Sequence, residues 1–307
     1  MFKFWDFKLD NFLSCSDLTK DQTIYLINLA RAFKNNKVNF KSAKYTLGLI
    51  FDKASTRTRV SFLTAMYKLD GMSIDLNPNT SQLGRGESIK DTARVLSRYC
   101  DVLAIRTFNQ KTLEDFAYWS TIPVINALTD LEHPCQILAD FLTIQEEFED
   151  FDRVSLTFMG DGNNVANSLI LCGAILDIDI RIASPKGFEP SDEIITKAKN
   201  LNRNFKLLLT DDVKEAVSGS NVLYTDVWSS MGQEVGAEEK DKKFAGYTLN
   251  KDILDLASPN AIVLHCLPAH RDKEITDEVI DSEQSRIFDQ AENRMHCQQA
   301  LLYHILN

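Results

Sequence analysis

The chain has 307 residues, of which 44% are hydrophobic and 25% are charged. This length exceeds what one hydrophobic core usually supports, and the composition is that of a globular protein, so two domains are expected. The formal net charge of −10 argues against a dedicated binder of nucleic acid or of anionic membranes, because the outer field repels polyanions.

The cysteine usage indicates a reducing environment. Six cysteines are spread along the chain without a C-x-x-C pair, namely Cys15, Cys100, Cys135, Cys172, Cys266 and Cys297. This pattern favours reduced thiols over a disulfide framework or a zinc site. The first ten residues lack the pattern of a signal peptide, and no apolar run approaches the ~18 residues of a membrane span. A cytoplasmic protein is therefore expected.

Helical and strand patterns alternate in the first half of the chain. Apolar spacing predicts helices at about 18–33, 55–69, 88–99 and 134–148, the first with Ser16-Asp17 as capping candidates and the last with proline at its first position. Short apolar runs predict buried strands at 45–51, 102–105 and 123–126.

The acidic stretch 146–152 predicts an exposed connection to a second unit. Strands are expected there at 154–159, 178–183, 206–209, 221–225 and 261–265, and helices after 160–162, at 192–201 and at 292–306. Such alternation is typical of parallel sheets with helices on both faces. We therefore expect an α/β fold of two doubly wound domains, 1–148 and 149–291, with the C-terminal helix 292–307 packing back on the first domain.

The strongest chemical signal is the run 51–59, Phe-Asp-Lys-Ala-Ser-Thr-Arg-Thr-Arg, which follows a predicted strand and opens a predicted helix. Hydroxyls and free backbone N–H groups at a helix start bind anions. Two arginines in one turn, Arg57 and Arg59, suit a phosphate because a guanidinium can bind two oxygens at once. The alternative is a capped helix with a solvated basic face, which explains Ser55 and Thr56 but not the interleaved arginines.

This run resembles the carbamoyl-phosphate signature of the aspartate/ornithine carbamoyltransferase family. Further motifs agree in the right order over nearly the whole chain: Arg106 at the end of a predicted strand, His133-Pro134-Cys135-Gln136 at the head of a helix, and Ala291-Glu292-Asn293-Arg294 near the end. One departure is Ala54, where many relatives have arginine, so that one positive charge beside the phosphate is missing.

The turn Gly160-Asp161-Gly162-Asn163-Asn164-Val165 follows a strand and opens a helix, as dinucleotide-binding turns do. Val165 stands at the third glycine position of that fingerprint, and Asp179 gives only weak support, so a nicotinamide site is not expected. In the family that the chain resembles, this turn belongs to the amino-acid domain. Asn164 would there hold the α-carboxylate or α-amino group of ornithine.

The run 226–234, Asp-Val-Trp-Ser-Ser-Met-Gly-Gln-Glu, taken alone is a loop after a strand with a turn at Gly232. It resembles the ornithine-binding pattern Asp-x-x-x-Ser-Met-Gly of the family. Asp226 would hold the α-ammonium group, while Ser230 and Met231 would cover the aliphatic stem. The charged run 236–243 that follows predicts the solvated outer part of a lid.

The run His265-Cys266-Leu267-Pro268 follows the last strong strand and matches the His-Cys-Leu-Pro of the family. The alternative is a Cys/His nucleophile pair. Because adjacent side chains on a strand point to opposite faces, His265 and Cys266 are not expected to pair directly. The resemblance implies instead that Cys266 lies beside the attacking amine.

The resemblance implies the ornithine carbamoyltransferase reaction, in which the carbamoyl group of carbamoyl phosphate moves to the side-chain amine of L-ornithine, giving citrulline and phosphate, commonly in arginine biosynthesis. The implied catalytic residues are Arg57, His133, Asp226 and Cys266. The implied carbamoyl-phosphate ligands are Ser55, Thr56, Arg57, Thr58, Gln82, Arg106, His133, Gln136, Cys266, Leu267 and Arg294. The implied ornithine ligands are Asn164, Asp226, Ser230 and Met231.

The resemblance also implies no metal or organic cofactor, and no nucleic-acid or membrane partner. Gln82 lies in a segment that relatives lend to a neighbouring subunit, so a homotrimer or a multiple of trimers is expected. Two alternatives stay open: a carbamoyltransferase for putrescine, N-acetylornithine or aspartate, and a non-catalytic homologue. The Asp226 motif argues against the first, and the intact set of motif residues argues against the second.

Overall fold

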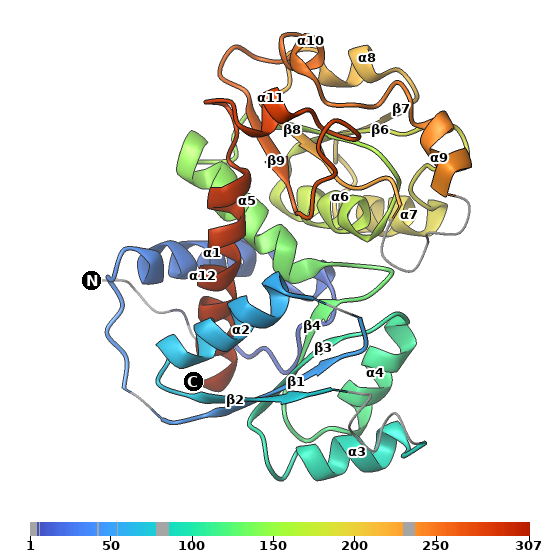
Figure 1. The fold of residues 1–307 in the computed structure, drawn as a ribbon. Helices are drawn as coiled ribbons and strands as arrows, with labels where there is room; N and C mark the ends of the chain where they lie inside the picture. Colours follow the sequence, from blue (N-terminus) through green and yellow to red (C-terminus); the bar gives the residue numbers. More distant parts are fainter. Residues whose placement is uncertain (1–4, 6, 42, 54, 78–85, 230–236) are drawn as a thin grey trace. The chain divides into compact units, whose positions relative to one another are not determined.

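The computed structural model describes residues 5, 7–41, 43–53, 55–77, 86–229 and 237–307. The chain forms two compact units, one comprising Met1–Leu142 with Glu292–Asn307 and the other Thr143–Ala291. Each unit contains one fully parallel sheet with helices around it (Figure 1). The division falls inside a helix at Leu142, a few residues before the domain boundary expected after residue 148.

The sheet of the first unit has the strand order β2-β1-β3-β4. Its strands are β1 (Thr46–Phe51), β2 (Met72–Leu76), β3 (Val102–Arg106) and β4 (Val124–Leu128). Every residue of the inner strand β3 and of the edge strand β4 is buried, as expected for a parallel sheet that is covered on both faces.

Helices of the first unit cover its sheet from two sides. α3 (Ile89–Leu96) and α4 (Gln110–Trp119) share one apolar cluster with β1 and β3, and α2 (Arg57–Lys68) lies on the other side of the sheet (Figure 1). The remaining helical segments are α1 (Lys20–Lys34), most of α5 (Pro134–Phe148) and most of α12 (Ile287–Leu306). Residues 292–307 belong to this unit, so the expected return of the C-terminal helix to the first domain is confirmed.

The sheet of the second unit has the order β7-β6-β5-β8-β9. Its strands are β5 (Ser155–Met159), β6 (Asp179–Ala183), β7 (Leu207–Thr210), β8 (Val222–Thr225) and β9 (Ile262–His265). Its helices are α6 (Asn164–Leu176), α7 (Asp192–Leu201), α8 (Val213–Val217), α9 (Ala237–Lys243), α10 (Lys251–Leu254) and α11 (Asp277–Ile280). The α/β fold expected from the alternation of strands and helices is confirmed.

Several elements differ from the sequence-based prediction. The strand β2 and the helices α4, α8, α9, α10 and α11 were not predicted, and α12 begins at Ile287 rather than near residue 292. The cap of α1 is Thr19, paired with Gln22, and not Ser16-Asp17. Asp17 is already used in a separate capping box with Ser14, which closes a short 3-10 helix at Cys15–Asp17.

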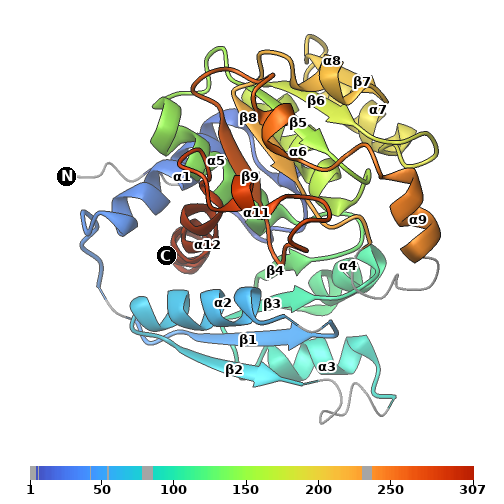
Figure 2. The ribbon, with the colours of Figure 1, turned by 45° about the horizontal axis from the view of Figure 1, so that its top comes forward.

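The strand orders place the sequence motifs at two equivalent points. In each sheet the order in which successive strands are added reverses between two inner strands. These strands are β1 and β3 in the first unit and β5 and β8 in the second (Figure 2). Ligands of open α/β sheets bind beyond the carboxyl ends of the strands at such a switch point. The run 55–58 follows β1 and Arg106 ends β3, while the turn 160–164 follows β5 and Asp226 follows β8. No helix in the described part of the chain is both long and apolar enough to cross a membrane.

Candidate active site

The start of α2 lacks a side-chain cap. Thr56 occupies the capping position with φ −83° and ψ −55°, which is a helical conformation, and its side chain makes no capping hydrogen bond. The Thr56 side chain therefore does not cap the first backbone N–H groups of α2, which lie at the positive end of the helix dipole. Such a helix start is suited to a bound anion.

Two buried guanidinium groups meet at one hydroxyl next to this helix start. Thr58 Oγ1 accepts hydrogen bonds from Arg294 Nη2 at 2.8 Å and from Arg106 Nη1 at 3.4 Å. The exposed fractions are 1% for Thr58, 6% for Arg106 and 3% for Arg294. Two like charges at a shared contact repel each other in a buried environment, so an anion placed between them would be strongly stabilised.

The head of α5 adds further polar groups to the same cluster. Arg294 Nη1 donates to Gln136 Oε1 at 2.9 Å, and Gln136 Nε2 donates to Asp140 Oδ1 at 2.8 Å. Burial, together with the charges of Arg294 and Arg106, holds the pKa of His133 well below its ordinary value of 6.5. His133 is therefore neutral at physiological pH, and its ring offers one N–H donor and one acceptor.

The loop that carries His133 is anchored by its neighbour Glu132, which is fully buried. Its carboxylate accepts from the Ser14 hydroxyl at 2.6 Å and from the backbone N–H of Cys15 at 2.9 Å. Thr129 closes the loop through a backbone bond to the Glu132 carbonyl at 2.9 Å. These hydrogen bonds hold the buried Glu132 carboxylate in place, and they therefore also restrain the backbone of the neighbouring His133.

Not every residue of the phosphate motif points to this cluster. Arg59 forms an ion pair with Asp75 of β2 at 3.2 Å and lies over the Phe51 ring at 5.4 Å. A neighbouring strand that was not predicted thus supplies a carboxylate to Arg59, and the joint binding of a phosphate by Arg57 and Arg59 stays a prediction. Ser55 and Arg57 are half-buried, and Thr56 is exposed.

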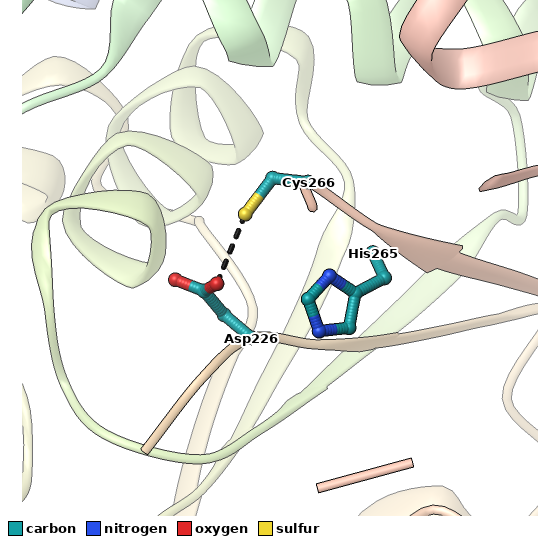
Figure 3. Close-up of side chains that lie close together, drawn as sticks. All are labelled: Asp226, His265 and Cys266. Atoms are coloured by element: carbon teal, nitrogen blue, oxygen red, sulfur yellow. Dashed lines mark hydrogen bonds between the residues drawn. The ribbon is translucent and has the colours of Figure 1, made fainter. Parts of the chain in front are cut away.

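The second cluster lies at the switch point of the other sheet, and Figure 3 shows three of its side chains, those of Asp226, His265 and Cys266. The Cys266 thiol donates to Asp226 Oδ1 at 3.0 Å, and the Asn163 side-chain amide donates to Asp226 Oδ2 at 2.8 Å. The backbone N–H of Val227 also donates to Oδ1, at 2.8 Å. Asp226 is 94% buried, since its exposed fraction is 6%, and it is held in one orientation with its charge stabilised by these donors.

His265 and Cys266 come closer together than strand alternation predicts. Ligand atoms of Asp226, His265 and Cys266 all lie within 4.8 Å of one another, because Cys266 follows the last residue of β9 and is free of the alternation (Figure 3). Both ring nitrogens of His265 are nevertheless engaged. Nδ1 accepts from the N–H of Leu267 at 2.9 Å, so Nε2 carries the proton toward Glu274 Oε1 at 3.1 Å.

These contacts decide what the cluster can do. His265 has no spare lone pair with which to deprotonate Cys266 or to bind a metal, unless one of its two hydrogen bonds breaks. A thiol nucleophile activated by histidine is therefore not supported, and we assign no metal to the group.

Three of the predicted ligands, Gln82, Ser230 and Met231, lie outside the described residues. Asn164 is the first residue of α6 and is half-buried, and Leu267 is half-buried with φ 56°.

Sequence reasoning missed two parts of the second cluster. Asn163 caps α6 and contacts Asp226, although only Asn164 was named as a ligand. The run 236–243 was interpreted as a solvated part of a lid, but residues 237–243 form α9, and the Lys240 side chain is only 15% exposed. The capping preference of asparagine could have pointed to Asn163, whereas no local signal marks Lys240.

Comparisons with known proteins agree with this arrangement. Residues 10–146 match the family model of the aspartate/ornithine carbamoyltransferase carbamoyl-P binding domain, and residues 152–305 match the Asp/Orn binding domain of the same family. Ornithine carbamoyltransferase of Prochlorococcus marinus subsp. pastoris is 64% identical over 293 residues, 95% of each chain. The enzyme of that name from a Nostoc species is 55% identical over 295 residues, 96% of each chain.

Solved structures with this fold carry the same name. The ornithine carbamoyltransferase of Pyrococcus furiosus is 44% identical with a TM-score of 0.93, covering 97% of each chain. That of Gloeobacter violaceus is 45% identical with a TM-score of 0.89, covering 98% of this chain and 99% of that chain. Two family models that together span most of the sequence, and relatives well above 30% identity over nearly its full length, lead to one conclusion: the chain belongs to the aspartate/ornithine carbamoyltransferase family.

Proposed function

We propose that the protein transfers the carbamoyl group of carbamoyl phosphate to the side-chain amine of L-ornithine, giving L-citrulline and phosphate. The observation that carries the proposal is the meeting of Arg106 and Arg294 at Thr58, beside the uncapped start of α2. A phosphate dianion offers what this cluster demands, namely several negatively charged acceptors for buried donors. The names of the relatives support the same reaction.

The phosphate group would bind at the start of α2. Backbone N–H groups and the hydroxyls of Ser55 and Thr56 supply neutral donors there, while Arg57 and Arg106 supply charge. As the C–O bond to phosphate breaks, negative charge grows on the departing group. Donors fixed in advance stabilise that charge without a reorganisation cost, and this is the larger part of the expected rate enhancement.

The carbamoyl group would be oriented by residues from the start of α2 and from the start of α5. Thr58, Arg57 and His133 are the proposed donors to the carbonyl oxygen, and Gln136 is the proposed acceptor for the NH2 group. Because His133 is kept neutral by burial and by the two arginines, it adds a donor without a third positive charge. Leu267, Cys266 and Gln82 remain proposed contacts of the same substrate.

Ornithine would bind at the Asp226 cluster. The buried carboxylate of Asp226 is suited to the α-ammonium group, and Asn164 offers an amide to the α-carboxylate or α-amino group. Ser230 and Met231 are proposed to cover the aliphatic stem. Cys266 donates its S–H to Asp226, so it serves as a hydrogen-bonding neighbour of the amine and not as a nucleophile.

The chemical step is an addition of the amine to the carbonyl carbon, which gives a tetrahedral intermediate, followed by elimination of phosphate. The neutral Nδ of ornithine forms a bond to the carbonyl carbon, the bond from that carbon to the phosphate oxygen breaks, and Nδ gives up a proton. An alkylammonium group has a pKa of ~10 in water, so the site must favour its deprotonated form. The departing phosphate is the proposed acceptor of the proton in the final step, which makes an enzyme base unnecessary.

We further propose a cytoplasmic homotrimer, or a multiple of trimers, that serves arginine biosynthesis. None of the six cysteines forms a disulfide bond, which supports a reducing compartment. Large apolar side chains of α2 and β2 are exposed in the single chain, with exposed fractions of 54% for Val60, 77% for Tyr67 and 57% for Met72. An exposed apolar group of this kind supports burial against a second copy.

The test measures citrulline formation from carbamoyl phosphate and ornithine, beside the products from putrescine, N-acetylornithine and aspartate, for the wild type and for Arg57→Ala. We expect turnover with ornithine alone, and a collapse of that turnover in the variant. Turnover with another amine would overturn the substrate but keep the transfer chemistry. No turnover with any amine would favour a non-catalytic member of the family.

A further inference from the structure

We propose that Lys240 is a positioning residue for the amino-acid substrate, acting through an ion pair with Asp161. This inference rests on the proposed function, since it assumes that the substrate amine binds at the Asp226 cluster. Neither Lys240 nor Asp161 was assigned a role from the sequence, and neither is placed in direct contact with a substrate.

The ion pair joins α9 to the turn that follows β5. Lys240 Nζ lies 2.6 Å from Asp161 Oδ2, and the exposed fractions of the two side chains are 15% and 17%. The ammonium group also lies over two aromatic rings, 5.3 Å from the centroid of Phe188 and 5.7 Å from that of Phe244. A pair this sheltered from water is screened less than a surface pair, and its loss leaves a partly buried charge without compensation.

Asp161 needs this partner. Burial raises its pKa, the nearby Asp226 acts in the same direction, and the hydrogen bond and charge of Lys240 oppose both effects. Without Lys240, two carboxylates would face each other at the edge of the cluster with less compensation. Repulsion between them would favour a displaced turn.

A displaced turn would reach the substrate site through a short series of contacts. The backbone N–H of Asn163 bonds to the Asp161 carbonyl at 2.6 Å, and the Asn163 side chain donates to Asp226 Oδ2 at 2.8 Å. Asp226 in turn accepts from Cys266 at 3.0 Å. The position of α9 is thus coupled to the carboxylate that is proposed to hold the α-ammonium group.

The turn has little freedom to adjust in other directions. A Cβ on Gly162 would stand 2.3 Å from the backbone nitrogen of Pro190 and 2.5 Å from the carbonyl carbon of Glu189. The backbone of Glu189 and Pro190 therefore packs against the turn at Gly162, and the Lys240 side chain contacts the turn at Asp161. Removal of Lys240 is expected to release the turn toward α9.

The experiment compares Lys240→Gln with Lys243→Gln by steady-state kinetics with both substrates. Lys243 is a matched control, because it lies in the same short helix and its ammonium group is 5.2 Å from the same Phe188 ring. The ion pair with Asp161 is formed by Lys240. For Lys240→Gln we expect the KM for ornithine to rise about tenfold, as for the loss of a hydrogen bond to a charged group. The KM for carbamoyl phosphate and kcat should change little.

Two further variants separate positioning from a general structural defect. Lys240→Arg should restore most of the wild-type KM because it keeps the charge and the reach. In a double-mutant cycle, Asp161→Asn with Lys240→Gln should cost clearly less than the sum of the two single effects. A loss of thermal stability alone, with KM unchanged, would be the mark of a merely structural pair.

The outcomes are distinct from those of the proposed function. A wild type that makes no citrulline from ornithine overturns the proposed function and this inference with it. A wild type that does so, with an unchanged KM in Lys240→Gln, an equal rise in Lys243→Gln or fully additive effects in the cycle, overturns the inference alone.

Discussion

The cluster around Thr58 shows how much depends on single buried charges. The contacts of Arg294 include hydrogen bonds to two neutral oxygens, those of Thr58 and Gln136, at 2.8 and 2.9 Å. A phosphate would add charged acceptors, which form stronger hydrogen bonds to a guanidinium than neutral oxygens do.

Arg294→Gln is expected to raise the KM for carbamoyl phosphate by about ten- to a hundredfold, the usual effect of losing a hydrogen bond to a charged group. Arg286→Gln is the control, because Arg286 stands just before α12 and bonds to Glu147 at the protein surface. Saturation curves in carbamoyl phosphate at fixed ornithine give the comparison. Equal KM values for Arg294→Gln and the wild type would contradict the assignment of Arg294 to the phosphate site.

The pH dependence of stability reports on His133. Its pKa is lowered by burial and by Arg294 and Arg106, so below pH 6.5 the unfolded chain binds a proton here that the folded protein does not bind. The contribution of this residue is thus complete above pH 6.5 and is lost as the pH falls toward the folded-state pKa.

We expect the free energy of unfolding, measured with denaturant at a series of pH values, to decrease below pH 6.5, and His133→Gln to make that decrease shallower. A residual slope is expected because burial also lowers the pKa of His296. An identical slope in His133→Gln would show that this residue does not titrate differently on folding.

At the level of secondary-structure elements, the start of α6 serves two purposes. Asn163 Oδ1 accepts from the N–H groups of Val165 and Ala166 at 2.9 and 3.2 Å, while its amide nitrogen donates to Asp226. One side chain thus caps the helix and orients the carboxylate of the proposed ornithine site. Removal of this side chain should therefore lower the stability of the protein and also weaken ornithine binding.

Asn163→Ala is expected to reduce the free energy of unfolding by about 1 kcal/mol, the usual cost of a lost cap, and also to raise the KM for ornithine. Asp212→Ala is the matched control, since Asp212 caps α8 with the same two bonds at 2.9 and 3.2 Å. It should lose similar stability with an unchanged KM. A rise in KM for both variants would mean that destabilisation alone impairs binding.

At the level of the whole molecule, the exposed apolar side chains of α2 and β2 support an interface between copies of the chain. Two tyrosines are equally exposed, each at 77%: Tyr67 in α2 and Tyr118 in α4. Tyr67 follows the exposed Val60 by seven residues in α2 and so shares its helix face, whereas Tyr118 lies in α4. A comparison of variants at Tyr67 and Tyr118 therefore distinguishes a side chain buried in an interface from one that is exposed on the surface of the assembled protein.

We expect a native mass of three chains of 34.8 kDa, or a multiple of that, in light scattering after gel filtration. Tyr67→Lys should lower this mass, because a charged group in an apolar interface is costly, whereas Tyr118→Lys should not. A wild type that elutes as a single chain would overturn the proposed trimer, and a wild-type mass in Tyr67→Lys would place the interface elsewhere.

The regular elements were largely predictable because their signals are local. Apolar spacing and a first-turn proline define α5 at 134–148, and a serine cap with apolar spacing defines α7 at 192–201, as predicted. The edge strand β2 did carry a local signal, because Met72, Ile74 and Leu76 alternate with Ser73 and Asp75 as in a half-buried strand, and the prediction missed it. The helices α8, α10 and α11 have five residues or fewer and are too short to show a helical period.

By itself, the sequence determined the fold class and the family, and it supplied the residue types of each proposed substrate position, because motifs such as 55–58 and 133–136 keep their chemistry within a few neighbouring residues. The tertiary structure alone decided which of these side chains meet. Arg106 and Arg294 are separated by most of the chain and share the Thr58 hydroxyl, whereas Arg59, only one residue from Thr58, turns to Asp75. Such contacts depend on which strands become neighbours, and strand order is set by the burial of whole faces and not by any local pattern.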